Sequence, residues 1–490
     1  MKQSINLITD YLRKDDGISG AMHYTEQISW LLFLKFLDDY EDRESYNAVL
    51  NGTTYDFILE KKYCWKNWTQ LPSGDDIKDF VNNELFPYLA TFRDSENDYH
   101  SMKYKIGEIF KFINNRIESG HTIKDITDEI NKLSFQKQGD LFELSWVYED
   151  LLQGMGNDGW NSGEFYTPRS VIKIMVEAIS PRIWEKICDP AAGSCGFLIE
   201  AFNFMKPKIS SDKELEILKN ETFFANEKTP LAYTMGMMNM ILHWISNPNL
   251  NKKNTLTTNI RDIEEKDKFD IILANPPFGG KEKEEIQQNF PIKTNATEML
   301  FLQYIIKILK NGGKSAIIVP EWVLFNNSNA FVEIKKKLIQ ECNLHSIVSL
   351  PAWVFLPYSG VKTNIIFFDK TGATQDIWYY EVDLWRKLTK NKPINYDEIK
   401  HIPELMKKRE ESENSWIVKV EDIQNFDLSA KNPNKIKEEI FREPDEILTE
   451  MTENEIEIQK IKNKIVGSNF ETSNPIFVKE DLEKLMRGGM

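Results

Sequence analysis

One tetrapeptide in this chain combines residue types that could hold a planar amine: Asn275-Pro276-Pro277-Phe278. It follows an apolar segment at 269–274 that is typical of a buried strand. Each proline fixes φ and removes a backbone donor, so the chain leaves the sheet there with its carbonyl groups facing outward. The Asn275 side-chain oxygen and the Pro276 carbonyl could then both accept hydrogens from one exocyclic NH2 group. Phe278 offers a flat face for the ring that carries this amine.

A base turned out of a nucleic-acid stack is a ligand of this kind. The alternative is an ordinary turn after a strand, since Asn-Pro is a common pair at the start of a turn. The tetrapeptide alone leaves both interpretations open, and the other motifs of the chain bear on the choice.

A second motif, at 189–198, follows a short predicted strand and opens a predicted helix. Its small residues allow a ligand to approach the backbone closely, and the free amides of the helix start face that ligand. The motif lacks the G-x-G-x-x-G pattern of dinucleotide sites. Asp189 beside glycines suits a cationic ligand such as S-adenosylmethionine, whose amino-acid end carries an ammonium group, better than a phosphate. A tight strand-to-helix turn without a ligand is the structural alternative.

Glu227 ends the next predicted strand, where a carboxylate can accept both hydroxyls of a ribose. Its alternative role is that of an acid stabilised by the positive end of the helix that follows. Because Asp189, Glu227 and Asn275 each follow a strand, we expect them at one edge of a parallel sheet, where ligands of α/β proteins bind. A cationic methyl donor beside an amine pocket is the arrangement that methyl transfer requires.

The chain divides into three regions by pattern. Residues 1–150 read as a helical domain built around an apolar helix at 28–37, and residues 151–430 begin with a glycine-rich connector. Strand and helix patterns then alternate, which predicts an α/β fold with a mostly parallel, doubly wound sheet. Residues 431–490 are charged and helical, with apolar residues near heptad spacing that pack either on the chain itself or on a partner. The predicted strands lie at 187–188, 222–225, 271–273, 315–319, 345–350, 363–368 and 377–382, with helices at 170–179 and 299–309 among them.

The strands at 345–350 and 363–368 are joined by a short loop, which favours an antiparallel edge to the sheet. No apolar run approaches the roughly 20 residues of a membrane span, and the N-terminus does not read as a signal peptide. The four cysteines form no CxxC pair and the six histidines show no metal-ligand spacing, so we expect neither disulfides nor a metal, in a reducing cytosol. The net charge of −15 argues against tight, autonomous DNA binding.

In their order along the chain, these motifs resemble those of the DNA adenine-N6 methyltransferases, and most closely the modification subunit of type I restriction-modification systems. The similarity covers almost the whole chain. It rests on the helix around Phe33-Leu34-Lys35 and on segments 163–169, 189–198, 275–279, 312–320 and 350–355.

The resemblance implies an S-adenosylmethionine-dependent methyltransferase fold with an N-terminal helical domain and a C-terminal helical tail for subunit docking. It implies cofactor contacts from Phe165, Tyr166, Thr167, Asp189, Ala191, Gly193, Ser194, Gly196, Glu227 and Asn275. Asn275 and Pro276 would hold the target amine, with Pro277 and Phe278 beside the flipped adenine. The residue that contacts the cofactor's adenine amine stays open between Asn254 and Asp262.

The resemblance further implies the reaction and the partners. A methyl group would pass from S-adenosylmethionine to the N6 amine of a flipped adenine in double-stranded DNA. A specificity subunit would read the DNA sequence, a second copy of this chain would join it, and a restriction or translocase subunit could be added. This division of labour in the cytoplasm would explain how so acidic a chain acts on DNA.

Three other functions fit parts of the pattern. Asn-Pro-Pro-aromatic motifs also occur in methyltransferases that act on RNA bases or on protein glutamine, which lack this N-terminal helical domain. A non-catalytic scaffold would not need Asp189, Glu227 and Asn275 together. A nicotinamide-dependent oxidoreductase would require the glycine pattern that is missing here.

Overall fold

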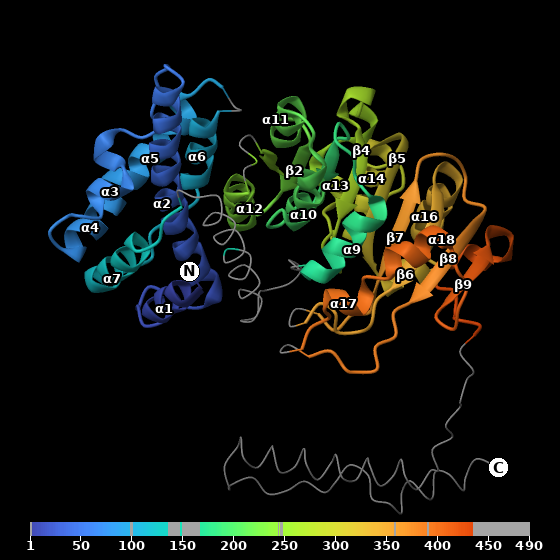
Figure 1. The fold of residues 1–490 in the computed structure, drawn as a ribbon. Helices are drawn as coiled ribbons and strands as arrows, with labels where there is room; N and C mark the ends of the chain where they lie inside the picture. The colour runs from blue at the N-terminus through green and yellow to red at the C-terminus, as the bar shows by residue number, and fades with distance from the viewer. Residues whose placement is uncertain are drawn as a thin grey trace, which may run out of the picture. The chain divides into compact units, whose positions relative to one another are not determined.

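The computed structural model describes residues 2–98, 101–135, 148, 167–243, 245, 248–356, 359–389 and 392–434 (Figure 1). Several predicted features lie outside these residues: the glycine-rich connector, Phe165, Tyr166, and the C-terminal segment from 435 onward. No helix in the described part of the chain has both the length and the apolar character that crossing a membrane requires.

The N-terminal region is helical, as the sequence predicts. The apolar helix α2 is buried at every position from 28 to 34, because the neighbouring helices enclose it on more than one side. The elements of this region are α1 (Lys2–Leu12), α2 (Ala21–Leu50), η1 (Lys61–Tyr63), α3 (Trp65–Trp68), α4 (Gly74–Phe80), η2 (Val81–Leu85), α5 (Phe86–Ser95), α6 (Met102–Phe110) and α7 (Gly120–Asn131).

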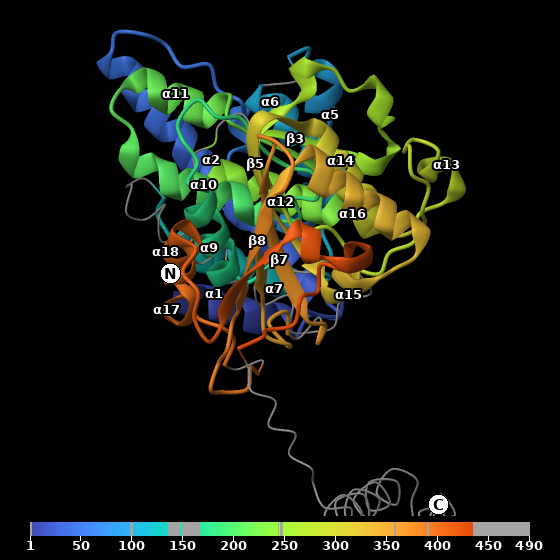
Figure 2. The same cartoon turned by 90° about the vertical axis from the view of Figure 1, so that its right-hand side faces the viewer.

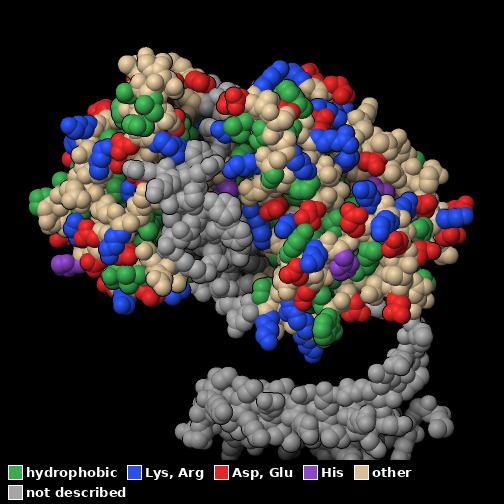
Figure 3. Space-filling view, in the orientation of Figure 1, with side chains coloured by type: hydrophobic (Ala, Val, Ile, Leu, Met, Phe, Trp, Pro, Cys, Tyr) green, Lys and Arg blue, Asp and Glu red, His purple; other side chains and the backbone are tan. Residues whose placement is uncertain are grey.

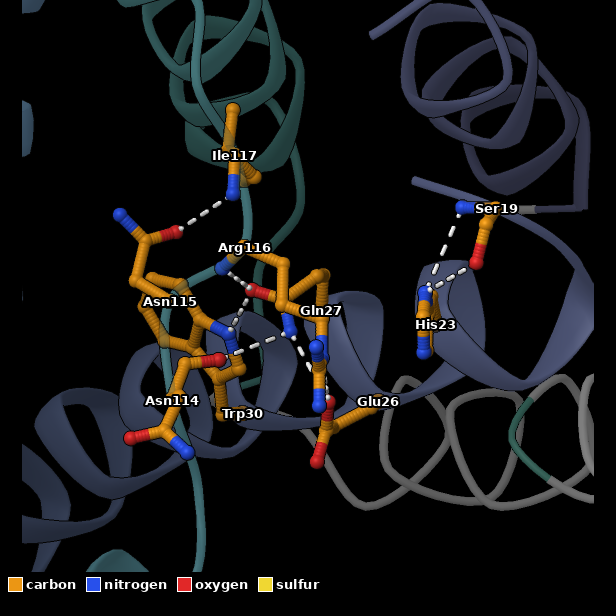
Figure 4. Close-up of polar contacts among 9 residues, drawn as sticks. All are labelled: Ser19, His23, Glu26, Gln27, Trp30, Asn114, Asn115, Arg116 and Ile117. Atoms are coloured by element: carbon orange, nitrogen blue, oxygen red, sulfur yellow. Dashed lines mark hydrogen bonds and ion pairs between the residues drawn. The ribbon is translucent and has the colours of Figure 1, made fainter. Parts of the chain in front are cut away.

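A buried amide joins the first turns of α2 to the segment between α6 and α7 (Figure 4). The Gln27 side-chain nitrogen donates to the Asn114 carbonyl at 3.1 Å, and its oxygen accepts from the Trp30 indole at 2.9 Å and the Arg116 backbone at 3.1 Å. The Arg116 guanidinium pairs with Glu26 at 3.0 Å. Because buried polar groups require partners, this network fixes the position of the connecting segment on α2.

The described strands after residue 167 form one sheet of nine, in the order β3-β2-β1-β4-β5-β7-β6-β8-β9. Parallel pairs join β3 to β2, β2 to β1, β1 to β4, β4 to β5, and β6 to β8. The strands are β1 (Ile187–Asp189), β2 (Phe223–Glu227), β3 (Asn249–Lys252), β4 (Phe269–Ala274), β5 (Leu309–Pro320), β6 (Asn343–Ser349), β7 (Thr363–Asp369), β8 (Asp376–Glu381) and β9 (Ser415–Lys419).

Helices cover both faces of this sheet (Figure 2). Ile187 and Cys188 point to opposite faces and belong to different apolar clusters, as alternate residues of a doubly covered strand should. One cluster joins the sheet to α9 (Arg169–Ile179), α10 (Gly196–Met205), α12 (Pro230–Leu242) and α18 (Ile402–Lys408), and the other joins it to α14 (Thr297–Ile308) and α16 (Asn329–Glu341). The other helices are α11 (Asp212–Asn220), α13 (Glu284–Gln287), α15 (Glu321–Phe325) and α17 (Tyr396–Ile399), with short η4 to η9 turns between elements.

The antiparallel part of the sheet differs from the sequence prediction in its position. The strand expected at 363–368 is antiparallel, but β7 lies inside the sheet, between β5 and β6. The antiparallel edge strand is β9, which pairs with β8. Two antiparallel steps across β7 make β5 and β6 parallel, so the carboxyl ends of β4, β5, β6 and β8 share one edge.

Candidate active site

The carboxyl ends of three adjacent parallel strands meet at one cavity. Asp189 ends β1, Glu227 ends β2, and Asn275 directly follows β4. All three line a cavity of about 530 Å³. Three motifs that are far apart in sequence therefore form one site, at the edge of the sheet that the sequence predicts.

The loop from β1 to α10 depends on two residues with left-handed backbone conformations. Gly193 has a φ of +51°, where a side chain is strained, and Cys195 has a φ of +64° as it caps α10. A Cβ atom on Gly236 of α12 would lie 2.9 Å from both the Cys195 sulfur and the Gly193 carbonyl oxygen. The Asn239 side chain donates to the Ser194 carbonyl at 2.9 Å. α12 thus packs against one side of this loop, and the other side of the loop lines the cavity.

Asp189 is a buried carboxyl group with one unused oxygen. Its Oδ1 accepts from the Ala191 backbone at 3.0 Å, whereas its Oδ2 is buried without a hydrogen-bond partner. Burial raises the pKa of Asp189 to about 8, and the Glu227 charge adds to this rise. A cationic group placed at Oδ2 would satisfy that oxygen and favour the ionised form.

Glu227 uses both of its carboxylate oxygens within the chain. Oε2 accepts from the Gly193 backbone at 2.9 Å, and Oε1 accepts from the Thr229 backbone at 2.7 Å and from its hydroxyl at 2.9 Å. The carboxylate therefore orders the loop after β1 as well as the start of α12. It lines the cavity with acceptor capacity left over, since each carboxylate oxygen has more than one lone pair.

The Asn275 side chain is held in one orientation. Its Nδ2 donates to the Thr167 hydroxyl at 2.9 Å, and its Oδ1 is buried without a partner. Thr167 is itself buried, directly before the start of α9. An unpaired buried acceptor is costly, and at a cavity wall it marks a place where a ligand donor is expected.

The aromatic residue of the motif is supported from the side. The Phe278 ring meets Phe355 edge to face, with centroids 6.0 Å apart and planes at 85°. The next residue, Gly279, has a φ of +69° and donates its backbone N–H to the Glu298 carboxylate. Glu298 is buried at the start of α14, so that helix fixes where the chain turns away from the site.

The sequence matches the models of two known protein families. The family model described as N-6 DNA Methylase matches residues 138–443, and the HsdM N-terminal domain model matches residues 1–130. The methylase subunit of the type I restriction enzyme EcoEI of Escherichia coli is 34% identical over 479 residues, covering 94% of this chain and 96% of that protein. The chain belongs to this family of type I restriction-modification methylase subunits.

Solved structures agree with this family membership. A modification subunit assigned to a type I restriction enzyme from Vibrio vulnificus YJ016 superposes with a TM-score of 0.80 at 34% identity, over 89% of this chain and 98% of that one. A second chain, from work on complex assembly and conformational transition of the type I R-M system, has a TM-score of 0.79 at 38% identity, over 100% and 98%. The fold is therefore that of the family's methyltransferases.

Among the described residues, the candidates for the cofactor site all line the one cavity: Thr167, Asp189, Ala191, Gly193, Ser194, Gly196, Glu227 and Asn275. Pro277 and Phe278 line it as well, whereas Pro276, between Asn275 and Pro277, is buried and does not line the cavity. Of the two residues left open, Asn254 lines the cavity and Asp262 does not. Asn254 uses its Oδ1 to cap η5 (Thr255–Thr257), accepting from the Leu256 backbone at 3.1 Å.

Sequence reasoning missed several supporting residues. Glu298 and Asn239 hold the two loops of the site from helices α14 and α12. Each is a polar residue buried in an otherwise apolar helix, which is the sequence signal that could have found them. Within the described part of the chain, His, Cys, Asp and Glu side chains form no cluster of three suited to a metal ion.

Proposed function

We propose that this DNA methylase subunit is an S-adenosylmethionine-dependent, adenine-N6-specific enzyme that acts on double-stranded DNA. The observation that carries the proposal is the Asn275 side chain. Its nitrogen is occupied by Thr167, and its oxygen is left as a buried acceptor in a cavity that also contains the unpaired oxygen of Asp189. One acceptor suits an amine substrate and the other suits a cationic donor.

The cavity residues fit S-adenosylmethionine. Asp189 Oδ2 would receive its ammonium group, the loop at Gly193 leaves open space for close approach, and Glu227 would accept from its ribose. Asn254, which lines the cavity, would contact its adenine. When bound, the cofactor would supply an electrophilic methyl group: the amine lone pair would form a bond to this carbon as the carbon–sulfur bond breaks, the thioether S-adenosylhomocysteine would leave, and the amine would lose one proton to water.

The chain's own residues would act on the target amine. Asn275 Oδ1 would accept one of its hydrogens, which draws the lone pair out of conjugation with the ring. The Pro276 carbonyl is the second acceptor that the sequence predicts, but Pro276 is buried and does not line the cavity. Phe278 would stack on the adenine turned out of the duplex. These groups work through position and fixed dipoles and need no strongly basic side chain.

We further propose that the chain works in a complex. The related chain of 38% identity comes from work on complex assembly in the type I R-M system. With a net charge of −15, this chain would rely on a separate specificity subunit for most of its DNA affinity. A second copy of this chain and a restriction subunit complete the proposed partners. The proposed regions are a helical domain at 1–150, a catalytic domain at 151–430 and a docking tail at 431–490.

The experiment measures methyl transfer from labelled S-adenosylmethionine to DNA, with the chain alone and with its co-expressed specificity subunit. Nucleoside analysis of the product then identifies the methylated base. We expect N6-methyladenine only when the partner is present. Methylcytosine, or label on RNA or protein instead of DNA, contradicts the proposed substrate, and full activity of the chain alone contradicts the need for a partner.

A further inference from the structure

Two exposed tryptophans stand on neighbouring loops at the edge of the sheet that holds Asn275. Trp385 lies between β8 and α17, and Trp353 lies between β6 and β7. Because β4, β6 and β8 run in the same direction, both loops leave the sheet at its carboxyl edge, as Asn275 does. Large exposed aromatic side chains beside a catalytic cavity call for an explanation by function.

The loop after β8 is joined directly to the site. The Ser170 hydroxyl donates to the Ile394 carbonyl at 3.0 Å, and Ser170 stands three residues after Thr167, which holds Asn275. At the other end of the loop, the Val382 backbone donates to the Ser349 carbonyl at 2.9 Å, at the end of β6. The loop therefore runs along the rim, between the start of α9 and the end of β6.

Arg386 holds described residues from both ends of this loop together. Its guanidinium pairs with both oxygens of Glu398 at 2.7 Å and donates to the Lys392 and Pro393 carbonyls at 2.8 Å. Leu388 is buried in the core below. None of these contacts involves the Trp385 side chain, which is fully exposed (103%). The loop presents this ring to solvent on a rigid support.

Trp353 is held outward by a strained backbone. Its φ is +71°, a conformation that bulky residues rarely adopt and that accumulates at functional sites. Its side chain is 53% exposed, and Gly360 fits closely against the ring, since a Cβ there would lie 2.4 Å from it. Two residues later, Phe355 is buried against Phe278. The exposed ring thus belongs to the same loop as Phe355, which supports the aromatic wall of the amine pocket.

The charge of the loop after β8 identifies its ligand. Residues 382–393 contain four basic residues and one acidic residue, in a chain whose net charge is −15. Lys387 and Lys392 are exposed there. Figure 3 shows Lys and Arg side chains beside hydrophobic ones at the lower margin of the molecule, where Figure 1 shows the loop before α17. Aromatic rings interleaved with lysines fit a nucleic acid, whose bases stack and whose phosphates are anionic.

We propose that Trp353 and Trp385, with Lys387 and Lys392, form a DNA contact at the rim of the amine pocket. The two rings stack on bases that become accessible beside the flipped target, and the two lysines contact the neighbouring phosphates. This contact rests on the proposed function and extends it, because it assigns part of the DNA affinity to this acidic chain itself. It holds the opened duplex at the pocket without reading the sequence.

The test uses the full chain assembled with its specificity subunit. The DNA is an unmethylated duplex that contains the sequence which this assembly methylates. Trp353→Ala and Trp385→Ala should each weaken DNA binding by roughly five- to 100-fold, the range for loss of one stacked base. Trp→Phe at either position should restore most of the affinity. Lys387→Gln and Lys392→Gln should each lower the slope of log Kd against log salt by about one. The affinity for S-adenosylmethionine should not change in any of these variants.

Trp184→Ala is the matched control. Trp184 is also exposed (55%) with a positive φ of 83°, but it precedes β1 at the opposite edge of the sheet. If the double variant Trp353→Ala/Trp385→Ala binds DNA within twofold of the wild-type affinity, the proposed contact is overturned. The proposed function still stands in that case, provided that the wild-type assembly methylates DNA. Loss of the specificity subunit from the variants on size-exclusion chromatography overturns the proposed contact in favour of a protein interface. Absence of DNA methylation by the wild-type assembly contradicts the proposed function itself.

Discussion

The Thr167 hydroxyl accepts a hydrogen bond from Asn275 Nδ2 at 2.9 Å, across 108 residues of sequence. A carboxamide can present either its oxygen or its NH2 group when it is turned by 180°. Thr167 engages the nitrogen, and so the oxygen is the atom left without a partner. In this orientation the contact leaves the Asn275 oxygen as the acceptor for a ligand.

Replacing Thr167 by Val should therefore lower kcat by roughly 10- to 100-fold, since a misdirected acceptor loses its alignment with the amine. Thr167→Ser keeps the hydroxyl and should retain most of the rate. Single-turnover methylation with saturating cofactor measures the effect on the chemical step. Because Thr167 also lines the cavity, the S-adenosylmethionine Kd of each variant is measured in parallel. A loss confined to cofactor affinity, with an unchanged single-turnover rate, would show that Thr167 does not position Asn275.

Asn275→Ala removes the acceptor itself and should lower the methylation rate by at least about 100-fold. Cofactor binding should persist, because Asp189 on β1, Glu227 on β2 and Gly193 in the loop after β1 keep their contacts. Isothermal titration with S-adenosylmethionine and a methylation assay on the same preparation separate the two effects. An equal loss of cofactor binding would place Asn275 in the cofactor site rather than the amine site.

The affinity for S-adenosylmethionine should rise with pH between about 6 and 8. Burial raises the pKa of Asp189 to about 8, so the free protein holds a proton there that binding of an ammonium group must displace. The rise is at most about tenfold per pH unit for one released proton. Titrations at several pH values, in buffers of different ionisation enthalpy, measure the affinity and the proton release together. Asp189→Asn should abolish both the pH dependence and the proton release.

The same carboxyl group affects stability with the opposite slope. The folded, ligand-free protein keeps the proton up to about pH 8, whereas the unfolded chain releases it near the ordinary value of 3.8. The stabilisation is complete below about pH 4 and is lost as the pH rises through about 8. The Tm of the wild type should therefore fall as the pH rises from about 4 to about 8. The Tm of Asp189→Asn, measured over the same pH range, lacks this contribution and serves as the reference.

Gly236→Ala should disturb the cofactor loop from behind. The added Cβ would stand 2.9 Å from the Gly193 carbonyl oxygen, a backbone atom that can move only with the loop. We expect a stability loss of about 1–3 kcal/mol and weaker S-adenosylmethionine binding. Gly372→Ala is the control, because its Cβ would meet no atom within 4 Å. Equal behaviour of the two variants would show that α12 does not support the loop.

Gln27→Leu should loosen the helical region, because its three partners lose their hydrogen bonds together and the Trp30 indole among them is buried. The expected cost is about 1–3 kcal/mol locally, the range for one buried group left unsatisfied. Hydrogen–deuterium exchange should accelerate over residues 111–119. The exposed Gln70 provides the control, since Gln70→Leu in the same region should leave exchange in that segment unchanged.

The sequence was sufficient to locate the strands that bear the site. Asp189, Glu227 and Asn275 each follow an apolar run, and parallel strands bring such ends together. It was not sufficient for β3, because this strand has three polar residues and a single apolar one, the buried Leu250, and therefore shows no hydrophobic period. The place of β7 inside the sheet was also beyond it, because a strand pattern does not specify which neighbours the strand will have.

Contacts between distant segments were the other limit. The Thr167–Asn275 bond and the Glu298–Gly279 bond each require a fold before the residues meet. The sequence assigned Pro276 to the amine and Phe278 to the adenine, but it could not show that Pro276 is buried without lining the cavity or that Phe278 packs against Phe355. Chemistry could be inferred from residue types, whereas the orientation of each group depends on packing.

The insertion of β7 between β5 and β6 has a consequence for biosynthesis. During translation, β5 and β6 leave the ribosome before the strand that joins them, so the edge of β5 from Ala316 to Val319 has no partner until residues 363–369 emerge. An unpaired apolar edge of this kind is a template for aggregation. Chains arrested before residue 363 should therefore depend on chaperones, and a ribosomal pause placed just after this point should give the sheet time to close.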